Sequence, residues 1–154
     1  MNDGTPIIVA LDHPSIQHAV DRFATELKQE KRYFGPSATP APFPSLIREL
    51  TQPGGLRLGT MVDGRLVAMA RVADSGETAL AVVDDWRNRG VGRSLLTFTA
   101  RRAGELGHGR IVLHSSRRSR ALASLGSTIG ATTVDHGRGR IDLIFATERF
   151  AHTA

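Results

Sequence analysis

The chain has 154 residues, of which 40% are hydrophobic and 23% charged, a composition that fits one ordinary globular domain and excludes a fibrous or wholly disordered chain. It has no cysteine, which excludes disulfides, thiolate metal sites and cysteine nucleophiles. Its 20 basic and 15 acidic side chains leave a net charge of +5.

The positive charge is concentrated in one part of the chain. Residues 87–140 carry eleven arginines and two acidic residues, a local charge of +9, whereas residues 1–86 carry eight basic and eleven acidic residues. A basic segment predicts a polyanionic partner, either a nucleic acid or a phosphorylated small molecule, and composition does not choose between them. No apolar run approaches the ~18 residues of a membrane span and no signal-peptide pattern begins the chain, so we expect a cytoplasmic protein without a membrane partner.

The first half of the chain predicts a strand and two helices. Residues 7–11 are apolar and predict the strand. Residues 12–30 combine helix-start chemistry with a one-sided apolar stripe and predict an amphipathic helix. The stripe consists of Ile16, Val20, Phe23 and Leu27. Four prolines within 34–45 predict an exposed loop, and 46–50 a brief second helix.

A β-hairpin is the clearest local pattern in the sequence. Residues 56–62 alternate in character up to Asp63-Gly64, and residues 65–73 return as the second strand. An Asp-Gly pair between two alternating runs is a strong hairpin signal. A further turn leads into a third strand of this meander at 77–83.

The second half returns to helix and strand patterns. Helical spacing over 91–106 ends at a glycine, and a short strand follows at 111–113. A small-residue stretch at 119–129 predicts a helix, and the last two strands are expected at 131–135 and 140–146.

The predicted order is therefore βααβββαβαββ. A meander that feeds a strand–helix–strand crossover indicates an α/β fold with a mixed sheet and helices packed against it. We expect one domain over residues 1–154, with 147–154 as a flexible tail.

A glycine turn joins the strand at 77–83 to the next helix. It contains Gly90 and Gly92 together with Arg87, Arg89 and Arg93. Unpaired N–H groups at a helix start favour anions, and glycines let a phosphate approach the backbone, so the turn is a candidate pyrophosphate site. The same pattern is typical of a plain strand-to-helix turn with solvated arginines.

Two other glycine loops do not fit this turn. A P-loop requires Gly-Lys-Ser/Thr at its end, with a different spacing. A dinucleotide fingerprint requires a third glycine, where this chain has Leu95, and an acidic residue ~20 positions further on.

The turn resembles the acetyl-CoA site of the GNAT acetyltransferase superfamily, whose signature Gln/Arg-x-x-Gly-x-Gly/Ala reads here Arg87-x-x-Gly90-x-Gly92. The predicted element order matches the family fold over nearly the whole chain. The resemblance implies a mostly antiparallel sheet that splays between its fourth and fifth strands, with helices on both faces and acetyl-CoA in the gap. It further implies pantetheine pairing with Ala81, Val82 and Val83, and pyrophosphate binding by Arg87, Asn88, Arg89, Gly90, Val91, Gly92 and Arg93.

Within the superfamily, the chain most resembles bacterial protein lysine acetyltransferases of the Pat type. The likeness lies in Arg32-Tyr33-Phe34 after the first helix and in Glu77, ten residues before Arg87. In those enzymes a glutamate at this offset acts as general base. Glu77 also shares one face of its strand with small residues, which leaves room for a substrate, although a strand-end carboxylate can equally be solvated.

The sequence identifies the oxyanion donor and the general acid less completely. A backbone N–H at Val82 or Val83 is the expected oxyanion donor. The tyrosine that many family members use as general acid is replaced here by Gly126. His114 ends the strand beside the cofactor gap, where it either assists proton transfer or is simply packed or solvated. No histidine lies in a metal-binding pattern, so no metal is expected.

These features predict an N-acetyltransferase that moves the acetyl group of acetyl-CoA directly to a primary amine, with protein lysine as the leading acceptor and a small amine second. A noncatalytic acetyl-CoA-binding regulatory module is the alternative. Nucleic-acid binding is disfavoured because only 5% of residues are aromatic and they do not interleave with the arginines. Many family members are dimers, which makes a homodimer one candidate assembly, but the sequence leaves the oligomeric state open.

Overall fold

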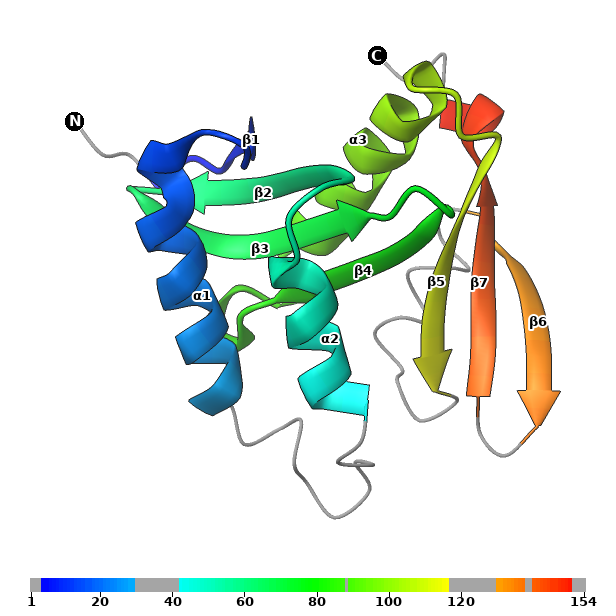
Figure 1. Ribbon diagram of the computed structural model, residues 1–154, viewed down its shortest axis with the longest axis horizontal. Coiled ribbons are helices and arrows are strands. Elements are labelled where there is room, and N and C mark those ends of the chain that lie inside the picture. The colour runs from blue at the N-terminus through cyan, green and yellow to red at the C-terminus, as the bar shows by residue number, and fades with distance from the viewer. Residues whose placement is uncertain (1–3, 30–41, 88, 117–129, 138–139, 151–154) are drawn as a thin grey trace.

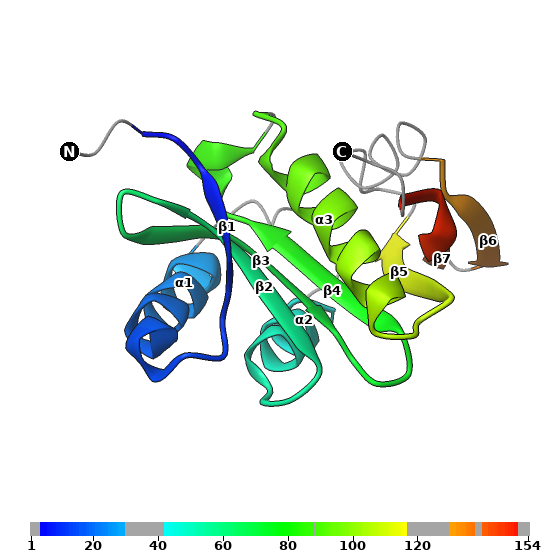
Figure 2. The same ribbon diagram turned by 90° about the horizontal axis from the view of Figure 1, so that it is seen from above.

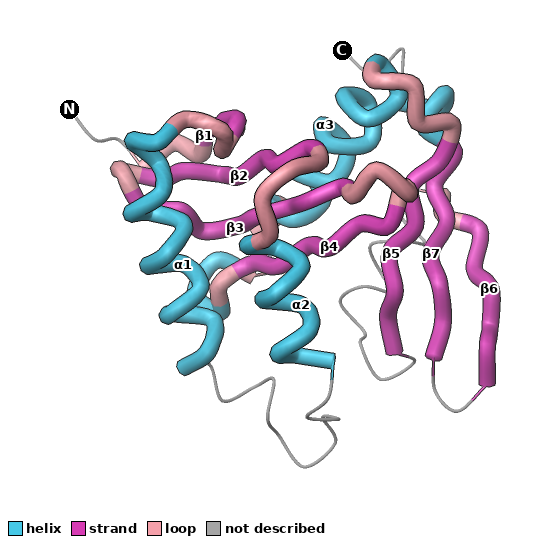
Figure 3. The backbone as a smooth tube through the Cα atoms, in the orientation of Figure 1, coloured by secondary structure: helices cyan, strands magenta, loops and turns pink. Residues whose placement is uncertain are grey.

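The computed structural model describes residues 4–29, 42–87, 89–116, 130–137 and 140–150. The strands are β1 (Ile7–Ala10), β2 (Leu56–Val62), β3 (Arg65–Val72), β4 (Glu77–Val82), β5 (Arg110–Ser116), β6 (Thr132–Gly137) and β7 (Arg140–Ala146). The helices are α1 (Gln17–Gln29), α2 (Pro42–Thr51) and α3 (Val91–Glu105), with short 3-10 turns η1 (Pro14–Ile16), η3 (Asp84–Trp86) and η4 (Thr147–Phe150). Figure 3 shows how these helices and strands alternate along the chain.

The strands form one mixed sheet in the order β1-β2-β3-β4-β5-β7-β6. Every neighbouring pair is antiparallel except β4 and β5, which run parallel. These two strands share only the pairs Glu77↔Val112 and Thr78↔Leu113. Beyond that shared start they diverge (Figure 1), which confirms the expected mixed sheet, splayed between its fourth and fifth strands.

Helices cover both faces of the sheet, as the fold class predicts. α1 and α2 lie on one face of β2–β4, and α3 lies on the other (Figure 2). The apolar stripe of α1 is buried as its spacing predicts, with Val20, Phe23 and Leu27 each at most 1% exposed. α3 buries Leu95 and Leu96 completely against the opposite face. None of the described helices has the length and apolarity needed to cross a bilayer.

The second helix begins earlier than the prolines suggest. α2 starts at Pro42, within the segment 34–45 that was predicted to be irregular. Pro42 and Pro44 both fall in the first turn, where an N–H has no intrahelical acceptor and proline is tolerated. Residues 30–41, which include Tyr33 and Phe34, lie outside the described part of the chain.

The C-terminal strands also differ from the local prediction. β5 extends over Arg110–Ser116 because it pairs with β7 along its whole length, from Arg110↔Ala146 to Ser116↔Arg140. Residues 147–150, expected to begin a flexible tail, form η4 and bury Thr147 and Phe150. The predicted helix at 119–129 and residues 151–154 lie outside the described residues.

Candidate active site

The start of α3 is a backbone cradle of the kind that the glycine turn predicts. Gly90, which precedes the helix, adopts a left-handed conformation with φ of 80°, and no side chain caps the helix there. The N–H of Ser94 donates to the Gly90 carbonyl at 3.0 Å. The N–H groups of Val91, Gly92 and Arg93 precede this bond, at the end of the helix where the positive end of its dipole lies. This end of α3 is therefore suited to an anion.

The two glycines of the turn serve different purposes. Gly90 has open space where a Cβ would lie, so crowding does not require glycine there. Its left-handed backbone conformation is what favours glycine. Gly92 lies within the helix, and a Cβ there would be 3.2 Å from Cγ2 of Val82. A Cβ at position 92 would be tight against this methyl group, so the Val82 side chain would have to shift by a few tenths of an ångström.

Two of the three predicted arginines contact protein groups around the turn. Nε of Arg87 donates to the carbonyl of Val82 at 3.1 Å, and its Nη1 lies 3.6 Å from Oδ1 of Asp84. The guanidinium of Arg89 lies over the ring of Trp86, 4.7 Å from the ring centroid. These contacts hold both positive charges close to the helix start. Asn88 lies outside the described residues.

Arg65, at the start of β3, ties this turn to the rest of the fold. Its guanidinium donates to both carboxylate oxygens of Asp85 at 2.9 and 3.0 Å, and to Oε2 of Glu26 on α1 at 2.6 and 3.2 Å. The hydrogen bonds from Arg65 hold the pKa of Asp85 below its usual value, and those to Asp85 and Glu26 raise the pKa of Arg65. The hydrogen bonds of this one guanidinium thus connect η3 and α1 to the start of β3.

The backbone of β4 presents alternate amides to the gap beside β5. The N–H of Val83 donates to the carbonyl of Val67 on β3 at 2.9 Å. Because successive residues of a strand direct their N–H groups to opposite edges, Ala81 also points toward β3, whereas Leu80 and Val82 point toward β5. Beyond the two residue pairs at their shared start, β5 no longer pairs with β4. The geometry therefore favours the N–H of Val82 over that of Val83 as a donor into the gap. It also adds the N–H of Leu80, which the sequence did not predict because the edge that an N–H faces depends on how β3 and β4 pair.

Glu77 lies at the point where β4 and β5 still pair, and its side chain is 54% exposed. Nε2 of His114, on β5, is 3.8 Å from Oε1 of Glu77. Nδ1 of the same ring is 2.7 Å from Oδ1 of Asp142, on β7. The sequence had identified Glu77 and His114 separately, but not Asp142, because only the β5–β7 register places it opposite His114. Among the described residues, no group of three or more His, Asp and Glu side chains is arranged to hold a metal ion.

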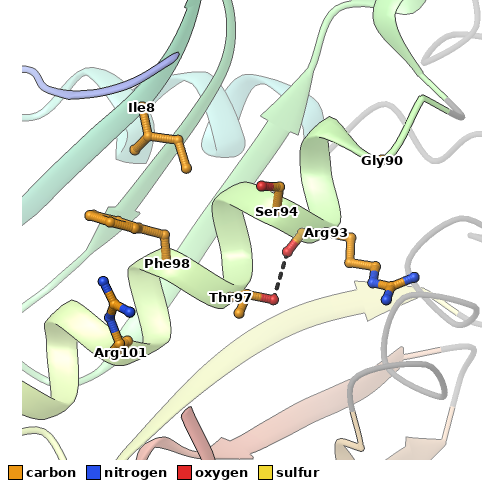
Figure 4. A pocket seen from close by; sticks show the side chains of 7 residues that line it. All are labelled: Ile8, Gly90, Arg93, Ser94, Thr97, Phe98 and Arg101. Carbon is orange, nitrogen blue, oxygen red and sulfur yellow. Dashed lines mark hydrogen bonds between the residues drawn. The ribbon is translucent and has the colours of Figure 1, made fainter. Parts of the chain in front are cut away.

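A groove of about 410 Å³ runs along the exposed side of α3 toward β1 (Figure 4). It is lined by Ile8, Gly90, Arg93, Ser94, Thr97, Phe98 and Arg101. It shares Gly90 and Arg93 with the cradle, so it continues from the helix start along α3. Arg93 points away from Ile8 and Phe98 in Figure 4, and its side chain is exposed.

Comparison with protein-family models gives one match. Residues 21–126 match the model described as the acetyltransferase (GNAT) family. The matched segment runs from α1 through the cradle into the predicted helix after β5. No curated protein sequence matches the chain significantly.

Solved structures with the same fold cover nearly the whole chain. The GNAT domain of S. lividans PAT has 20% identity and a TM-score of 0.71, with 93% of this chain and 91% of that one covered. The PaiA N-acetyltransferase of Thermoplasma acidophilum, in complex with coenzyme A, has 15% identity and a TM-score of 0.71, with 92% and 99% covered. The ribosomal-protein-S18-alanine N-acetyltransferase of Escherichia coli has 16% identity and a TM-score of 0.63, with 91% of each chain covered. At these identities the likeness is one of fold.

Replacing Arg65 with glutamine tests how the turn is held. We expect the free energy of unfolding to fall by about 1 kcal/mol at neutral pH, because two charged partners lose their hydrogen bonds at a partly exposed site. Since the pKa of Asp85 is lowered in the folded state, its contribution is lost as pH falls through that value, so the difference between variant and wild type should shrink in acid. Urea denaturation at several pH values measures this difference. Arg22→Gln, which removes a more exposed partner of Glu26, is the control and should cost only ~0.3 kcal/mol.

Gly90→Asp and Gly90→Asn form a matched pair for the cradle. Both side chains tolerate the left-handed conformation and both can cap a helix, so both variants should fold with similar melting temperatures. Only aspartate places a negative charge where phosphates would bind, and at a few ångströms this repulsion is worth ~1–4 kcal/mol. We expect the dissociation constant for coenzyme A to be at least about tenfold higher for the aspartate variant, as measured by calorimetry. Wild-type affinity in both variants would show that phosphates bind elsewhere.

Proposed function

Because this chain belongs to the acetyltransferase (GNAT) family and is an acetyl-CoA-dependent N-acetyltransferase, we propose that it transfers the acetyl group directly to a primary amine. The lysine side chain of a protein is the leading acceptor, and a small-molecule amine is the second. The observation that carries this proposal is the exposed carboxylate of Glu77 at the end of the gap where β4 and β5 are still paired.

We assign cofactor binding to Leu80 and Val82 on β4, whose N–H groups face the gap, and to residues 87–93, whereas the N–H groups of Ala81 and Val83 face β3. The fit rests on two features of this chain: the uncapped start of α3, and the close approach of Gly92 to Val82, which a Cβ would disturb. Three arginines surround that helix end and supply the positive charge that a diphosphate requires. The cofactor itself would supply an activated thioester carbonyl.

Glu77 acts in this proposal as the general base. A free alkylamine is almost wholly protonated at neutral pH, with a pKa near ~10.4, so the acceptor must lose a proton before it attacks. A carboxylate both attracts the ammonium group and accepts its proton. The N–H of Val82, which points into the gap, stabilises the negative charge that develops on the carbonyl oxygen.

The exposure of Glu77 supports an acceptor presented by a larger molecule. Its side chain is 54% exposed and that of His114 is 45% exposed, so this part of the sheet is accessible from solvent. A lysine side chain can extend its ammonium group to such a site without being enclosed. Similar folds are found in one enzyme named for a protein acceptor, the ribosomal-protein-S18-alanine N-acetyltransferase, and in a chimeric spermidine N-acetyltransferase, so fold alone does not choose the acceptor.

Glu77→Gln separates catalysis from cofactor binding. The amide keeps the shape of the side chain but accepts no proton, so we expect kcat to fall about 10²–10⁴-fold while the coenzyme A dissociation constant stays within about twofold. Free thiol release and calorimetry measure the two quantities. Wild-type turnover in this variant would exclude Glu77 as the base.

An acceptor panel tests the acceptor class directly. Acetyl-CoA is supplied with lysine-containing proteins and peptides, polyamines and small amines, and acetylation is located by mass spectrometry. We expect acetyl-lysine in protein or peptide substrates at a kcat/KM at least about tenfold above that of any small amine. The reverse order would favour a small-amine acetyltransferase. Coenzyme A binding without transfer to any amine would favour a regulatory module.

A further inference from the structure

Three neighbouring strands align a carboxylate, an imidazole and a second carboxylate in one row. Glu77 is paired with Val112 across the parallel β4–β5 start, and His114 lies two residues further along β5 on the same face. His114 is paired directly with Asp142 on β7. The three side chains therefore project from the same face of the sheet, beside the opening of the gap between β4 and β5.

The contact between His114 and Asp142 determines which ring nitrogen carries hydrogen in the neutral imidazole. Nδ1 lies 2.7 Å from Oδ1 of Asp142, whose side chain is only 18% exposed. An ionised carboxylate can only accept a hydrogen bond, so Nδ1 must be the donor. Nε2 is then left with a lone pair, and it is this nitrogen that faces Oε1 of Glu77 at 3.8 Å.

We propose that Glu77 passes the proton of the acceptor amine to Nε2 of His114, and that Asp142 positions the ring for this transfer. The separation of 3.8 Å is longer than a hydrogen bond, as is common for catalytic contacts before substrate binds, and a small side-chain rotation closes it. Two carboxylates flank the resulting imidazolium and stabilise its charge. The ring is 45% exposed, so the proton can leave to solvent.

The relay balances the protons of the reaction. The ammonium group loses one proton to Glu77 and then to His114 before the nitrogen–carbon bond forms. As the carbon–sulfur bond breaks, the nitrogen loses a second proton and the leaving thiolate gains one. One proton is therefore released to solvent in each turnover, and His114 regains its neutral form.

This arrangement gives a directional pH dependence. Imidazole is the side chain whose protonation changes near neutral pH, and the charged groups that the described structure places against this ring are Glu77 from β4 and Asp142 from β7. Once His114 is protonated, its Nε2 has no lone pair left, so it can no longer take the amine proton from Glu77. The relay therefore operates only with a neutral His114 ring, and turnover should be lower in acid than at neutral pH.

His114→Gln tests the relay, which rests on the proposed function and is measured with an amine that wild type acetylates. We expect kcat at neutral pH to fall about 10–100-fold, with coenzyme A affinity and melting temperature nearly unchanged, and the acidic limb of the pH–rate profile to move or vanish. His18→Gln, on the exposed face of α1, is the matched control and should leave the profile unchanged. The double variant Glu77→Gln/His114→Gln should be no slower than Glu77→Gln alone, because both residues serve one proton path.

A second measurement does not depend on turnover. Nitrogen-15 NMR of the histidine rings should show His114 with hydrogen on Nδ1 when neutral, and Asp142→Asn should weaken that preference and lower kcat about tenfold. Wild-type kcat and pH profile in His114→Gln would overturn the relay and leave the proposed function standing. Hydrogen on Nε2 in the neutral wild-type ring would also overturn it. If wild type acetylates no amine at all, the proposed function fails and the relay fails with it.

Discussion

The fold depends on the parallel pairing of β4 with β5, which stops after two residue pairs. A strand in the middle of a sheet normally satisfies its N–H and C=O groups on both edges, because leaving them unpaired costs free energy. Here the inner edge of β4 is satisfied by β3, while the N–H groups of Leu80 and Val82 face the open edge, where the Val82 carbonyl accepts from Arg87. An extended, amide-bearing ligand is the natural partner for such an edge. The start of α3 follows the end of β4, so the open edge of the strand leads toward the helix end that is suited to an anion.

The positive charge around the cradle is fixed by the protein itself. Arg87 holds the carbonyl that ends β4, Arg89 lies over Trp86, and Arg65 fastens the preceding turn through Asp85. These contacts place charge near the helix start without leaving it free to move, so little side-chain entropy is lost when an anion binds. The basic character of residues 87–140 is therefore partly structural, which explains how a strongly basic chain can serve a small phosphorylated ligand.

The polar row across β4, β5 and β7 lies at the opposite end of the gap from the cradle. It sits where the strands are still paired, so Glu77 and His114 are held by adjacent backbones and not by loops. A cofactor that entered from α3 would therefore meet an amine that approached from the exposed side of this row. The cradle and the row would then hold the two substrates on either side of the splayed strands, and the chemistry would take place between them.

The sequence by itself determined the order of the described helices and strands, the hairpin at Asp63-Gly64, the apolar face of α1 and the glycine turn before α3, because each is encoded by neighbours a few residues apart. It also identified Glu77 and His114 as separate candidates. Only the tertiary structure decided that these two meet, that Asp142 completes the row, that Val82 and not Val83 points into the gap, and that Arg65 braces the turn. Strand register and the choice of hydrogen-bonding edge arise from pairing between segments far apart in the chain, and no local pattern of residues specifies which side chains that pairing will bring together.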